Sequence, residues 1–312
     1  MIAAIEYVSS RQREWDAFID GSKNGTFILK RGYMEYHADR FADASVVFED
    51  GRGEIVAVLP ASFHGAEVRS HGGITYGGII GDRRMTAARM LECFNSMQSY
   101  YRSHGIKTIL YKRVPSIFHK YPADEDLYAL FRNGATLCDS KISCAIDLSG
   151  PIDFSDARRR CVKKAARSGI TVKQSCDYEE YMEMVSAVLL AHHGAKPVHT
   201  GAEIRLLASR FPGNIKLFCA YLGDKMIAGV LVYDANSVVH TQYIVNSEEG
   251  REIGALDAVM DYLIHSYCAG KRYFDMGTSN GKSGHQLNEG LIAQKEMFGG
   301  RAIVYEAYRL DI

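Results

Sequence analysis

The chain of 312 residues lacks an excess of charge of either sign and any long run of apolar residues. Its 37 Lys and Arg side chains balance its 37 Asp and Glu side chains, so the chain as a whole has no field that would attract nucleic acid or an anionic membrane. A membrane-spanning helix needs about 18 or more consecutive apolar residues, and no such run occurs. The N-terminus also lacks an apolar core after a basic start. We therefore expect a cytoplasmic protein that has no membrane span and binds no DNA.

The cysteines do not form a recognisable framework. There are 7 of them, and they include no Cys-x-x-Cys pair, which is typical of reduced thiols in a reducing compartment. His192, His193 and His199 form a local group of possible metal ligands, but no carboxylate or cysteine completes a recognisable spacing around them. We expect no metal site and no permanently bound cofactor.

The two halves of the sequence show the same order of segments. A hydrophobic content of 47% allows one large domain or two of ordinary size, and we favour two. In the first half the segments are strands 44–49 and 54–63, the glycine-rich segment 71–78, helix 83–104 and strand 106–112. In the second half they are strands 215–222, 226–233 and 237–245, helix 253–269 and strand 271–276. The repeated order predicts a duplicated α/β unit with mixed sheets, divided near 148–151 into halves 1–150 and 151–312.

Polar residues gather directly after the last of these strands, within 273–299. Glycines in this stretch allow the backbone to turn or to approach a ligand closely. The side chains around them can donate and accept hydrogen bonds, and they are Asp275, Ser279, Asn280, His285 and Asn288. This density of polar groups predicts a functional site at the end of the strand, with Ser279, Asn280 and Asn288 as candidate substrate contacts.

Motifs in the second half resemble the FemAB-like branch of the GNAT acyltransferases. A hydrophobic strand that ends in aspartate and glycine stands at 273–277, and a lysine shortly before Phe-Gly stands at Lys295. A basic helix at 158–167, followed by 169–172, looks like the start of that family's second domain. The resemblance implies two tandem GNAT-like halves, with a degenerate acceptor side in the first half and the donor site and catalysis in the second.

The resemblance also implies a function. It points to an N-acyltransferase that carries an acyl group from acyl-CoA to an amino group of a cell-envelope or sugar precursor. One alternative is aminoacyl-tRNA-dependent transfer to a peptidoglycan precursor, which the basic helix favours. Another, from a different class, is a GNAT-like protein that binds a ligand without catalysis.

Three residues of the second half are candidates for catalysis. The resemblance assigns Lys295 to the stabilisation of transition-state charge, because a fixed ammonium suits a developing oxyanion. Asp275 could hold the ammonium group of the acceptor or orient Lys295. Alternation along 237–245 puts His240 on one otherwise apolar face together with Gln242, a candidate substrate contact, and this polar pair could orient or deprotonate an amine. A hydrogen-bonded core role is the ordinary alternative for a histidine on a strand.

Residues for binding the donor and the acceptor lie elsewhere. In the GNAT fold that this order resembles, a helix N-terminus receives the pyrophosphate of acyl-CoA. Arg251 and Gly254 match the superfamily's loop pattern at this point, whereas Leu256 stands where a small residue is usual. In the first half, Tyr76 could stack on a sugar or nucleotide, and Lys112 could contact an anionic acceptor. A tight connection between strands is the ordinary alternative for the segment around Tyr76.

Two further patterns are weaker guides. Residues 277–283 imitate a phosphate-binding P-loop, but only three residues separate their glycines where four are required, so we expect no ATP site. The cations of 158–167 could meet tRNA or a diphosphate, although a solvated helix face is the commoner explanation of such a run.

Overall fold

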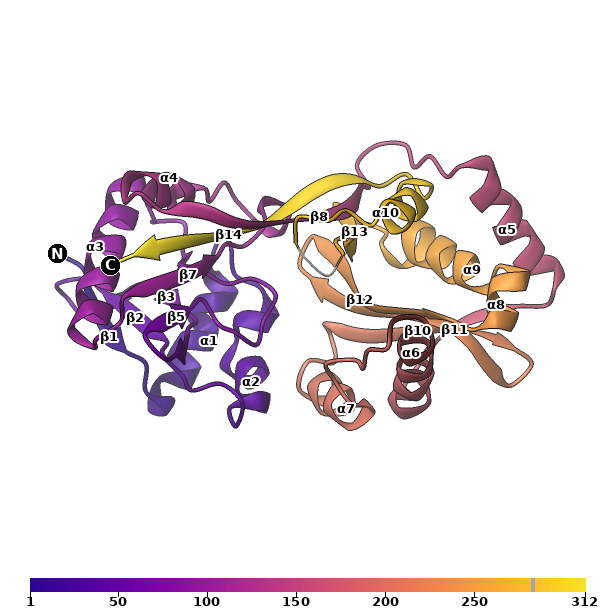
Figure 1. Cartoon of the computed structure of the whole chain (residues 1–312), viewed down its shortest axis with the longest axis horizontal. Helices are drawn as coiled ribbons and strands as arrows, with labels where there is room; N and C mark the ends of the chain where they lie inside the picture. The colour runs from indigo at the N-terminus through magenta and orange to yellow at the C-terminus, as the bar shows by residue number, and fades with distance from the viewer. Residues whose placement is uncertain (282–283) are drawn as a thin grey trace. The chain divides into compact units, whose positions relative to one another are not determined.

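The chain folds into two compact units of mixed α/β structure (Figure 1). The computed structural model describes residues 1–281 and 284–312, with the side chain of residue 193 left out. The first unit comprises Met1–Ile142, Asn280–Gln286 and Val304–Ile312, and the second comprises Ser143–Ser279 and Leu287–Ile303. Strands β8 (Thr136–Asp147) and β14 (Arg301–Asp311) therefore contribute residues to each unit. The boundary near 148–151 stays a prediction about domains.

The first unit contains strands of two sheets and three longer helices. One sheet has the order β1-β2-β3-β6, and the strands β4-β5-β7-β14 are one end of a ten-stranded sheet. The strands are β1 (Ala3–Glu6), β2 (Val46–Glu49), β3 (Ile55–Leu59), β4 (Ser62–His64), β5 (Glu67–Arg69), β6 (Ile80–Gly81) and β7 (Thr108–Lys112). The helices are α1 (Gln12–Gly21), α2 (Arg31–Met34), α3 (Ala87–Ser103) and α4 (Glu125–Arg132), of which α2 is a single turn.

The second unit is a sheet with helices on both faces. Its strands follow the order β8-β13-β12-β11-β10-β9. Helix α9 packs on β10 and β11 from one side, while α6 and α7 cover the other side (Figure 1). The strands are β9 (Thr171–Ser175), β10 (Ile215–Leu222), β11 (Lys225–Ala235), β12 (Val238–Asn246) and β13 (Tyr273–Thr278). The helices are α5 (Asp156–Arg167), α6 (Tyr178–His193), α7 (Gly201–Arg210), α8 (Glu248–Ile253), α9 (Ala255–Tyr262) and α10 (Glu289–Glu296), and a π-helical turn at Leu263–Tyr267 follows α9.

Several expected segments differ in extent from the observed elements, for local reasons. Strand 215–222 is confirmed as β10. The expected strand 54–63 is two strands, β3 and β4, because Pro60 between them has no N–H to donate to a ladder. The expected helix 253–269 is divided at Gly254, which takes the left-handed conformation with φ 80°. Strands β8 and β14 were not expected at all.

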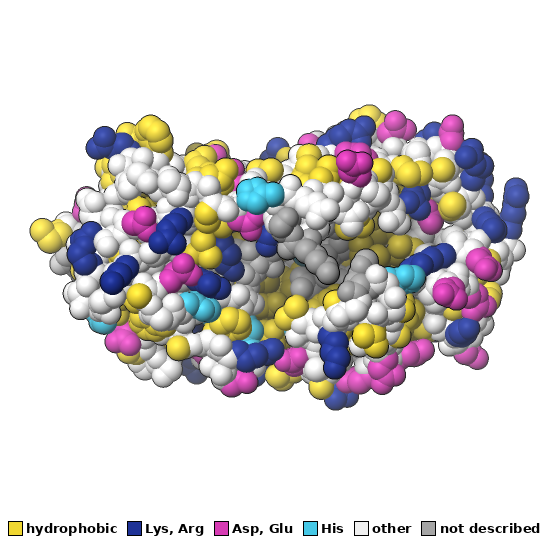
Figure 2. Space-filling model, in the orientation of Figure 1, with side chains coloured by type: hydrophobic (Ala, Val, Ile, Leu, Met, Phe, Trp, Pro, Cys, Tyr) yellow, Lys and Arg dark blue, Asp and Glu magenta, His cyan; other side chains and the backbone are white. Residues whose placement is uncertain are grey.

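Helix α5 has one buried side and one exposed cationic side. It packs against α9, and Arg158 points inward, with its guanidinium 4.6 Å from the ring centroid of Phe298 and 3.0 Å from an oxygen of Asp257. Figure 2 shows dark blue side chains gathered on the surface along α5. The exposed cations of the helix are Arg159, Arg160, Lys163, Lys164 and Arg167.

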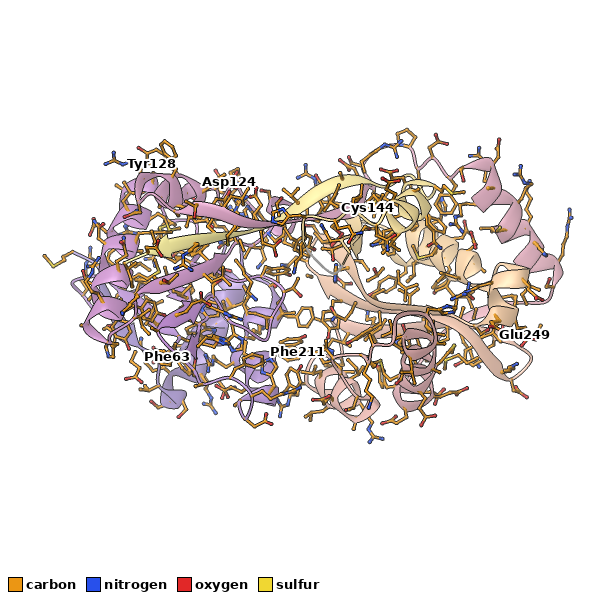
Figure 3. All side chains as sticks on the ribbon, in the orientation of Figure 1. Phe63, Asp124, Tyr128, Cys144, Phe211 and Glu249 are labelled. Carbon is orange, nitrogen blue, oxygen red and sulfur yellow. The ribbon has the colours of Figure 1, made fainter. Side chains whose placement is uncertain are left out.

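Gly300, just before β14, allows α10 and β14 to pack closely on β8 and β13. A Cβ atom at Gly300 would lie 2.5 Å from the sulfur of Cys144 and 2.7 Å from the methyl carbon of Met276. Cys144 is labelled on β8 in Figure 3 and is fully buried. The Phe-Gly-Gly sequence that follows Lys295 therefore has a packing role, because a side chain at Gly300 would displace two core residues.

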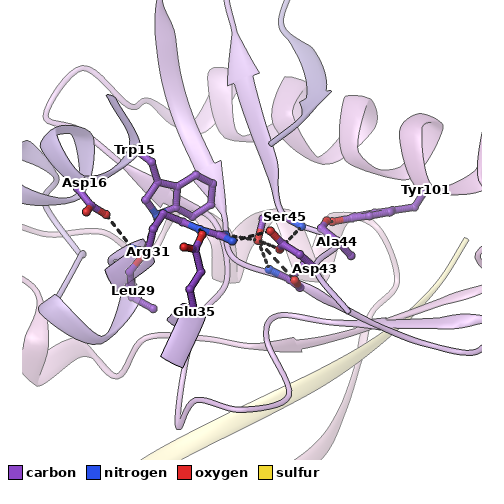
Figure 4. Close-up of polar contacts among 10 residues, drawn as sticks. Trp15, Asp16, Leu29, Arg31, Glu35, Asp43, Ala44, Ser45 and Tyr101 are labelled. Carbon is purple, nitrogen blue, oxygen red and sulfur yellow. Dashed lines mark hydrogen bonds and ion pairs between the residues drawn. The ribbon is translucent and has the colours of Figure 1, made fainter. Parts of the chain in front are cut away.

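A buried arginine organises the core of the first unit (Figure 4). The guanidinium of Arg31 donates to Glu35 at 2.9 Å, to Asp43 at 2.5 Å and to Ser45 at 3.0 Å. It also lies 3.9 Å from the ring centroid of Tyr7. Because the buried charge is paired and hydrogen-bonded, this cluster has a sufficient structural explanation.

No helix among residues 1–281 and 284–312 is long and apolar enough to cross a membrane.

Candidate active site

Strands β12 and β13 run side by side for only part of their length. They pair in parallel from Val238 with Tyr273 to His240 with Asp275. Beyond that pair β12 continues to Asn246 and β13 to Thr278, with no further partner residues in the described register. The strands therefore part directly after His240 and Asp275, and from there on β12 has no partner strand on its β13 side in the described register.

A cavity of about 360 Å³ lies where the two strands have parted. Its walls come from α6, β12, α8, α9, β13 and α10, and most of the lining side chains are apolar. The lining residues are Val188, Ile244, Val245, Asn246, Arg251, Leu256, Met260, Met276, Leu291, Gln294, Lys295 and Phe298. A concave, largely apolar site with a few polar groups is the usual form of a small-molecule pocket.

Lys295 is a buried cation on the wall of this cavity. Asn288 caps the N-terminus of helix α10, since its side chain accepts a hydrogen bond from the Leu291 N–H at 3.0 Å. Lys295 lies near the C-terminal end of this helix. The Nζ atom donates to the carbonyl oxygens of Gly277 at 2.7 Å and Thr278 at 2.9 Å. Burial lowers the pKa of Lys295 from 10.5 to about 8, and the negative charge of Asp275 opposes this shift.

Asp275 is a fully buried carboxylate with polar contacts from β8, β12 and β13 among the described residues. Its Oδ1 accepts from the hydroxyl of Ser143 at 2.6 Å and from the N–H of Gly277 at 3.2 Å. Its Oδ2 lies 2.7 Å from Nδ1 of His240. These contacts place Asp275 beside His240 and leave its side chain 0% exposed. These contacts link the carboxylate of Asp275 to the imidazole of His240.

Gly277 connects the two candidate catalytic groups. Its φ of 74° lies in the left-handed region, which glycine adopts without strain. Its carbonyl oxygen binds Lys295, and a Cβ atom on it would lie 3.6 Å from Cε1 of His240. The imidazole and the ammonium group are thus both positioned against one residue at the end of β13.

Four of the predicted substrate contacts lie in four different structural environments. Ser279 is 0% exposed, and its Oγ is buried with no hydrogen-bond partner. The side chain of Asn280 bonds to the N–H of Ile142 at 2.9 Å and to the carbonyl of Gly284 at 2.6 Å, so it stabilises a loop. Asn288 caps α10. Gln242 is the extra residue of a β-bulge, because Tyr243 pairs with Leu231 and Thr241 with Val232. This bulge interrupts the alternation that was expected along 237–245.

Two N–H groups in the segment expected to bind pyrophosphate already have hydrogen-bond partners within that segment's own turn. The N–H of Arg251 bonds to the carbonyl of Ser247 at 2.9 Å, and the N–H of Gly250 bonds to the hydroxyl of Ser247 at 3.0 Å. A Cβ atom at Gly254 would lie 2.6 Å from the carbonyl oxygen of Cys161, so this glycine is needed for the contact with α5. Of this segment, the side chain of Arg251 and that of Leu256 reach the cavity.

The two predicted acceptor contacts of the first unit are both inward-facing. Tyr76 is buried, its ring centroid lies 4.8 Å from that of Phe118, and its hydroxyl lies 3.1 Å from that of Thr26. The ammonium group of Lys112 donates to the carbonyl of Ile74. Burial lowers the pKa of Lys112 to about 7, and the nearby charges of Lys141 and Arg69 add to the shift.

The possible metal ligands and the P-loop-like stretch lie only partly within the described residues. Among the described residues, no group of three or more His, Cys, Asp or Glu side chains could hold a metal ion. Nδ1 of His199 lies 2.8 Å from the hydroxyl of Tyr243, whereas the side chain of His193 lies outside the described set. Lys282 and Ser283 of the P-loop-like stretch also lie outside the described residues.

The sequence did not point to Ser143 as a residue of this site. It lies on β8, a strand that is exposed over its first half and therefore carries no clear alternation. The pairing of Ser143 with Thr278 across β8 and β13 brings its hydroxyl to Asp275. Only a prediction of β8 and of its neighbour in the sheet would have found it.

Comparison with known protein families found a match in the part of the chain that contains β12 and β13. Residues 155–286 match the family described as an acetyltransferase (GNAT) domain. Over its whole length this chain has the fold of FemX and of a tandem GNAT protein. The expected fold class and family resemblance are therefore confirmed. No curated protein matches this chain in sequence.

Solved structures resemble this GNAT-fold chain over nearly its whole length. The crystal structure of FemX has a TM-score of 0.70 at 13% identity and covers 99% of this chain and 97% of its own. L-PGS from Bacillus licheniformis has a TM-score of 0.63 at 13% identity, with 97% and 91% covered. A tandem GNAT protein from the clavulanic acid biosynthesis pathway has a TM-score of 0.53 at 14% identity, with 100% and 98% covered. At these identities the likeness concerns the fold.

Proposed function

We propose that this chain is an N-acyltransferase that forms an amide, with the acyl donor bound between β12 and β13. One observation carries the proposal: the cavity at the parting of these strands has the buried ammonium group of Lys295 on its wall. Aminolysis of an activated acyl group passes through a tetrahedral oxyanion, and a fixed positive charge in a water-poor site stabilises that charge strongly.

The hydrogen bonds of Lys295 leave a donor for this task. An ammonium group has three N–H donors, and two of them are directed at the carbonyls of Gly277 and Thr278. The third is available to an oxyanion in the cavity. Because the two carbonyls hold the ammonium in place before the reaction, little reorganisation is needed when negative charge develops.

Acyl-CoA is the donor that we propose. The open backbone of β12 after His240 can hydrogen-bond a chain that carries amide groups, in the manner of an added strand. The apolar lining suits an alkyl segment, and the exposed side chain of Arg251 at the cavity suits a phosphate. For the acceptor we keep the amino group of a cell-envelope or sugar precursor.

A second candidate is an aminoacyl-tRNA donor. The N–H groups of Gly250 and Arg251 are already bonded to Ser247, so they offer less to a pyrophosphate than an open turn would. The exposed cations of α5 offer a surface for a polyanion instead (Figure 2). The exposed positive charge of α5 therefore supports a polyanionic donor such as aminoacyl-tRNA.

Calorimetric titration tests the choice of donor. Acetyl-CoA should bind saturably to the purified chain, and the Lys295→Ala variant should still bind it. If tRNA binds with steep salt dependence and acetyl-CoA does not bind, the donor is aminoacyl-tRNA. If donors bind but none is consumed with any amine acceptor, the chain is a GNAT-like binding protein without catalysis.

A further inference from the structure

The side chains of Ser143, Asp275 and His240 form a hydrogen-bonded chain across three neighbouring strands. Ser143 on β8 donates to Oδ1 of Asp275 on β13 at 2.6 Å, and Oδ2 of Asp275 lies 2.7 Å from Nδ1 of His240 on β12. Ser143 and Asp275 are each 0% exposed, so water does not compete for these bonds. A rigid sheet thus holds all three side chains in one geometry.

The donors around Asp275 determine which nitrogen of His240 carries the proton. A carboxylate that accepts from a hydroxyl and from the Gly277 N–H is favoured in its ionised form. Oδ2 can then only accept, so Nδ1 of His240 must be the donor of the 2.7 Å bond. The neutral imidazole therefore has its lone pair on Nε2.

The ring of His240 is partly open to solvent. The side chain is 15% exposed, whereas its partner carboxylate is 0% exposed. Because Nδ1 faces Asp275, Nε2 lies on the ring edge that points away from this carboxylate. Cε1, the atom between the two nitrogens, lies next to Gly277, whose carbonyl binds Lys295. A base on this edge and an ammonium on the cavity wall are the two groups that aminolysis requires.

We propose that Nε2 of His240 accepts the proton of the attacking amine, and that Ser143 is a positioning residue which holds Asp275 so that His240 keeps this tautomer. The inference rests on the proposed acyl transfer. The nitrogen of a neutral amine attacks the donor carbonyl, and a C–N bond forms as an N–H proton moves to Nε2. The bond to the leaving group then breaks, and the proton on Nε2 passes to the departing thiolate or ribose oxygen. The products are the amide and the protonated leaving group, and His240 returns to its neutral form.

The tautomer can be measured without any substrate. Two-bond ¹H–¹⁵N correlation spectra of the full chain distinguish a protonated Nδ1 from a protonated Nε2, and a His240→Gln variant assigns the signals. We expect Nδ1 to be protonated in the unmodified chain. A protonated Nε2 in the neutral ring would overturn the proposal, because Nε2 could then accept no proton.

Three serine variants test the positioning role. In Ser143→Ala we expect a mixture of tautomers and a fall in kcat of about ten- to a hundred-fold, with the KM for the donor unchanged. Ser149→Ala is the matched control, because Ser149 also donates to an aspartate at 2.6 Å but lies on the exposed side of the Asp147 turn. Ser143→Thr keeps the hydroxyl and should restore most of the rate and the single tautomer.

The two proposals fail in different ways. If Ser143→Ala keeps both the tautomer and the rate, the positioning role is wrong while acyl transfer stands. If the unmodified chain consumes no donor, acyl transfer is wrong, and the tautomers of the unmodified chain and of Ser143→Ala still decide whether Ser143 orients His240.

Discussion

The Nζ atom of Lys295 lies 2.7 Å from the carbonyl oxygen of Gly277, the left-handed residue of β13. The bond links α10 to the end of a strand from which β12 has just parted. Burial lowers the pKa of this lysine to about 8, and the negative charge of Asp275 opposes the shift, so the ammonium form predominates at neutral pH. The carbonyl of Gly277 therefore holds a charged group in position at the wall of the cavity.

Loss of the Lys295 side chain should reduce catalysis more than binding. In Lys295→Ala we expect kcat to fall roughly 10²- to 10³-fold, the usual effect of removing one oxyanion donor. The affinity for the donor should change little, because the other walls of the cavity remain. Lys225→Ala, which removes an exposed lysine paired with Glu249, is the control and should keep full activity. Steady-state rates and calorimetry measure the two effects, and an unchanged kcat in Lys295→Ala would refute the assigned role.

The pH dependence of the rate should reveal the lowered pKa of Lys295. The ammonium form predominates below about pH 8, so the contribution of Lys295 is complete there and is lost as the pH rises through 8. In Lys295→Arg this alkaline limb should disappear, because a guanidinium stays charged up to at least about pH 12. Rates from pH 6 to 10 for both proteins test this. An identical limb in Lys295→Arg would assign it to another group.

A larger side chain in the cavity should prevent donor binding. Leu291 lines the cavity from α10, and in Leu291→Trp the indole ring would occupy part of its 360 Å³. We expect acyl-CoA affinity to fall at least about tenfold, since contacts in the pocket are replaced by overlap. Leu287→Trp is the control, because Leu287 precedes α10, is exposed and does not line the cavity. Equal affinities for the two variants would place the donor elsewhere.

The inward-facing arginine of α5 should stabilise the second unit. In Arg158→Met the carboxylate of Asp257, 8% exposed, would remain buried without its counter-charge, and the contact with Phe298 would be lost. We expect the free energy of unfolding to fall by about 3 kcal/mol. Arg160→Met, two positions along the helix and exposed, should change it by less than about 0.5 kcal/mol. Urea unfolding of both variants measures the difference, and equal losses would mean that Arg158 is not a structural cation.

Stability should depend on pH through Lys112 in the first unit. Burial lowers the folded pKa of Lys112 from 10.5 to about 7, so the unfolded chain holds the extra proton between these values and stability rises with pH there. The cost of the buried charge is complete below pH 7. The change in the free energy of unfolding caused by Lys112→Met should therefore be more stabilising at pH 6 than at pH 10. Urea unfolding at both pH values checks this, with the exposed Lys107→Met as control; the same change at pH 6 and pH 10 would contradict it.

Local signals were enough to find the elements whose residues alternate or end at a glycine or proline. Strand β10 was expected with its observed bounds, and α3 ends one residue before the expected end of helix 83–104, with Gly105 at φ 74° just beyond it. Strand β8 was not found, because its first half is exposed and its partners are distant in sequence. The inward turn of Arg158 was also hidden, since composition alone does not show which side of a basic helix packs.

The amino-acid sequence by itself determined the repeated order of strands, helix and strand in the two halves and the concentration of polar residues after β13, because both follow from neighbours along the chain. It also placed Lys295 shortly before Phe298 and Gly299. Tertiary structure alone decided that β12 leaves β13 after Asp275, and that Asp275 meets Ser143 from 132 positions away. The physical reason is that strand pairing joins residues regardless of their separation in sequence, so the contacts that orient His240 exist only once the sheet has formed.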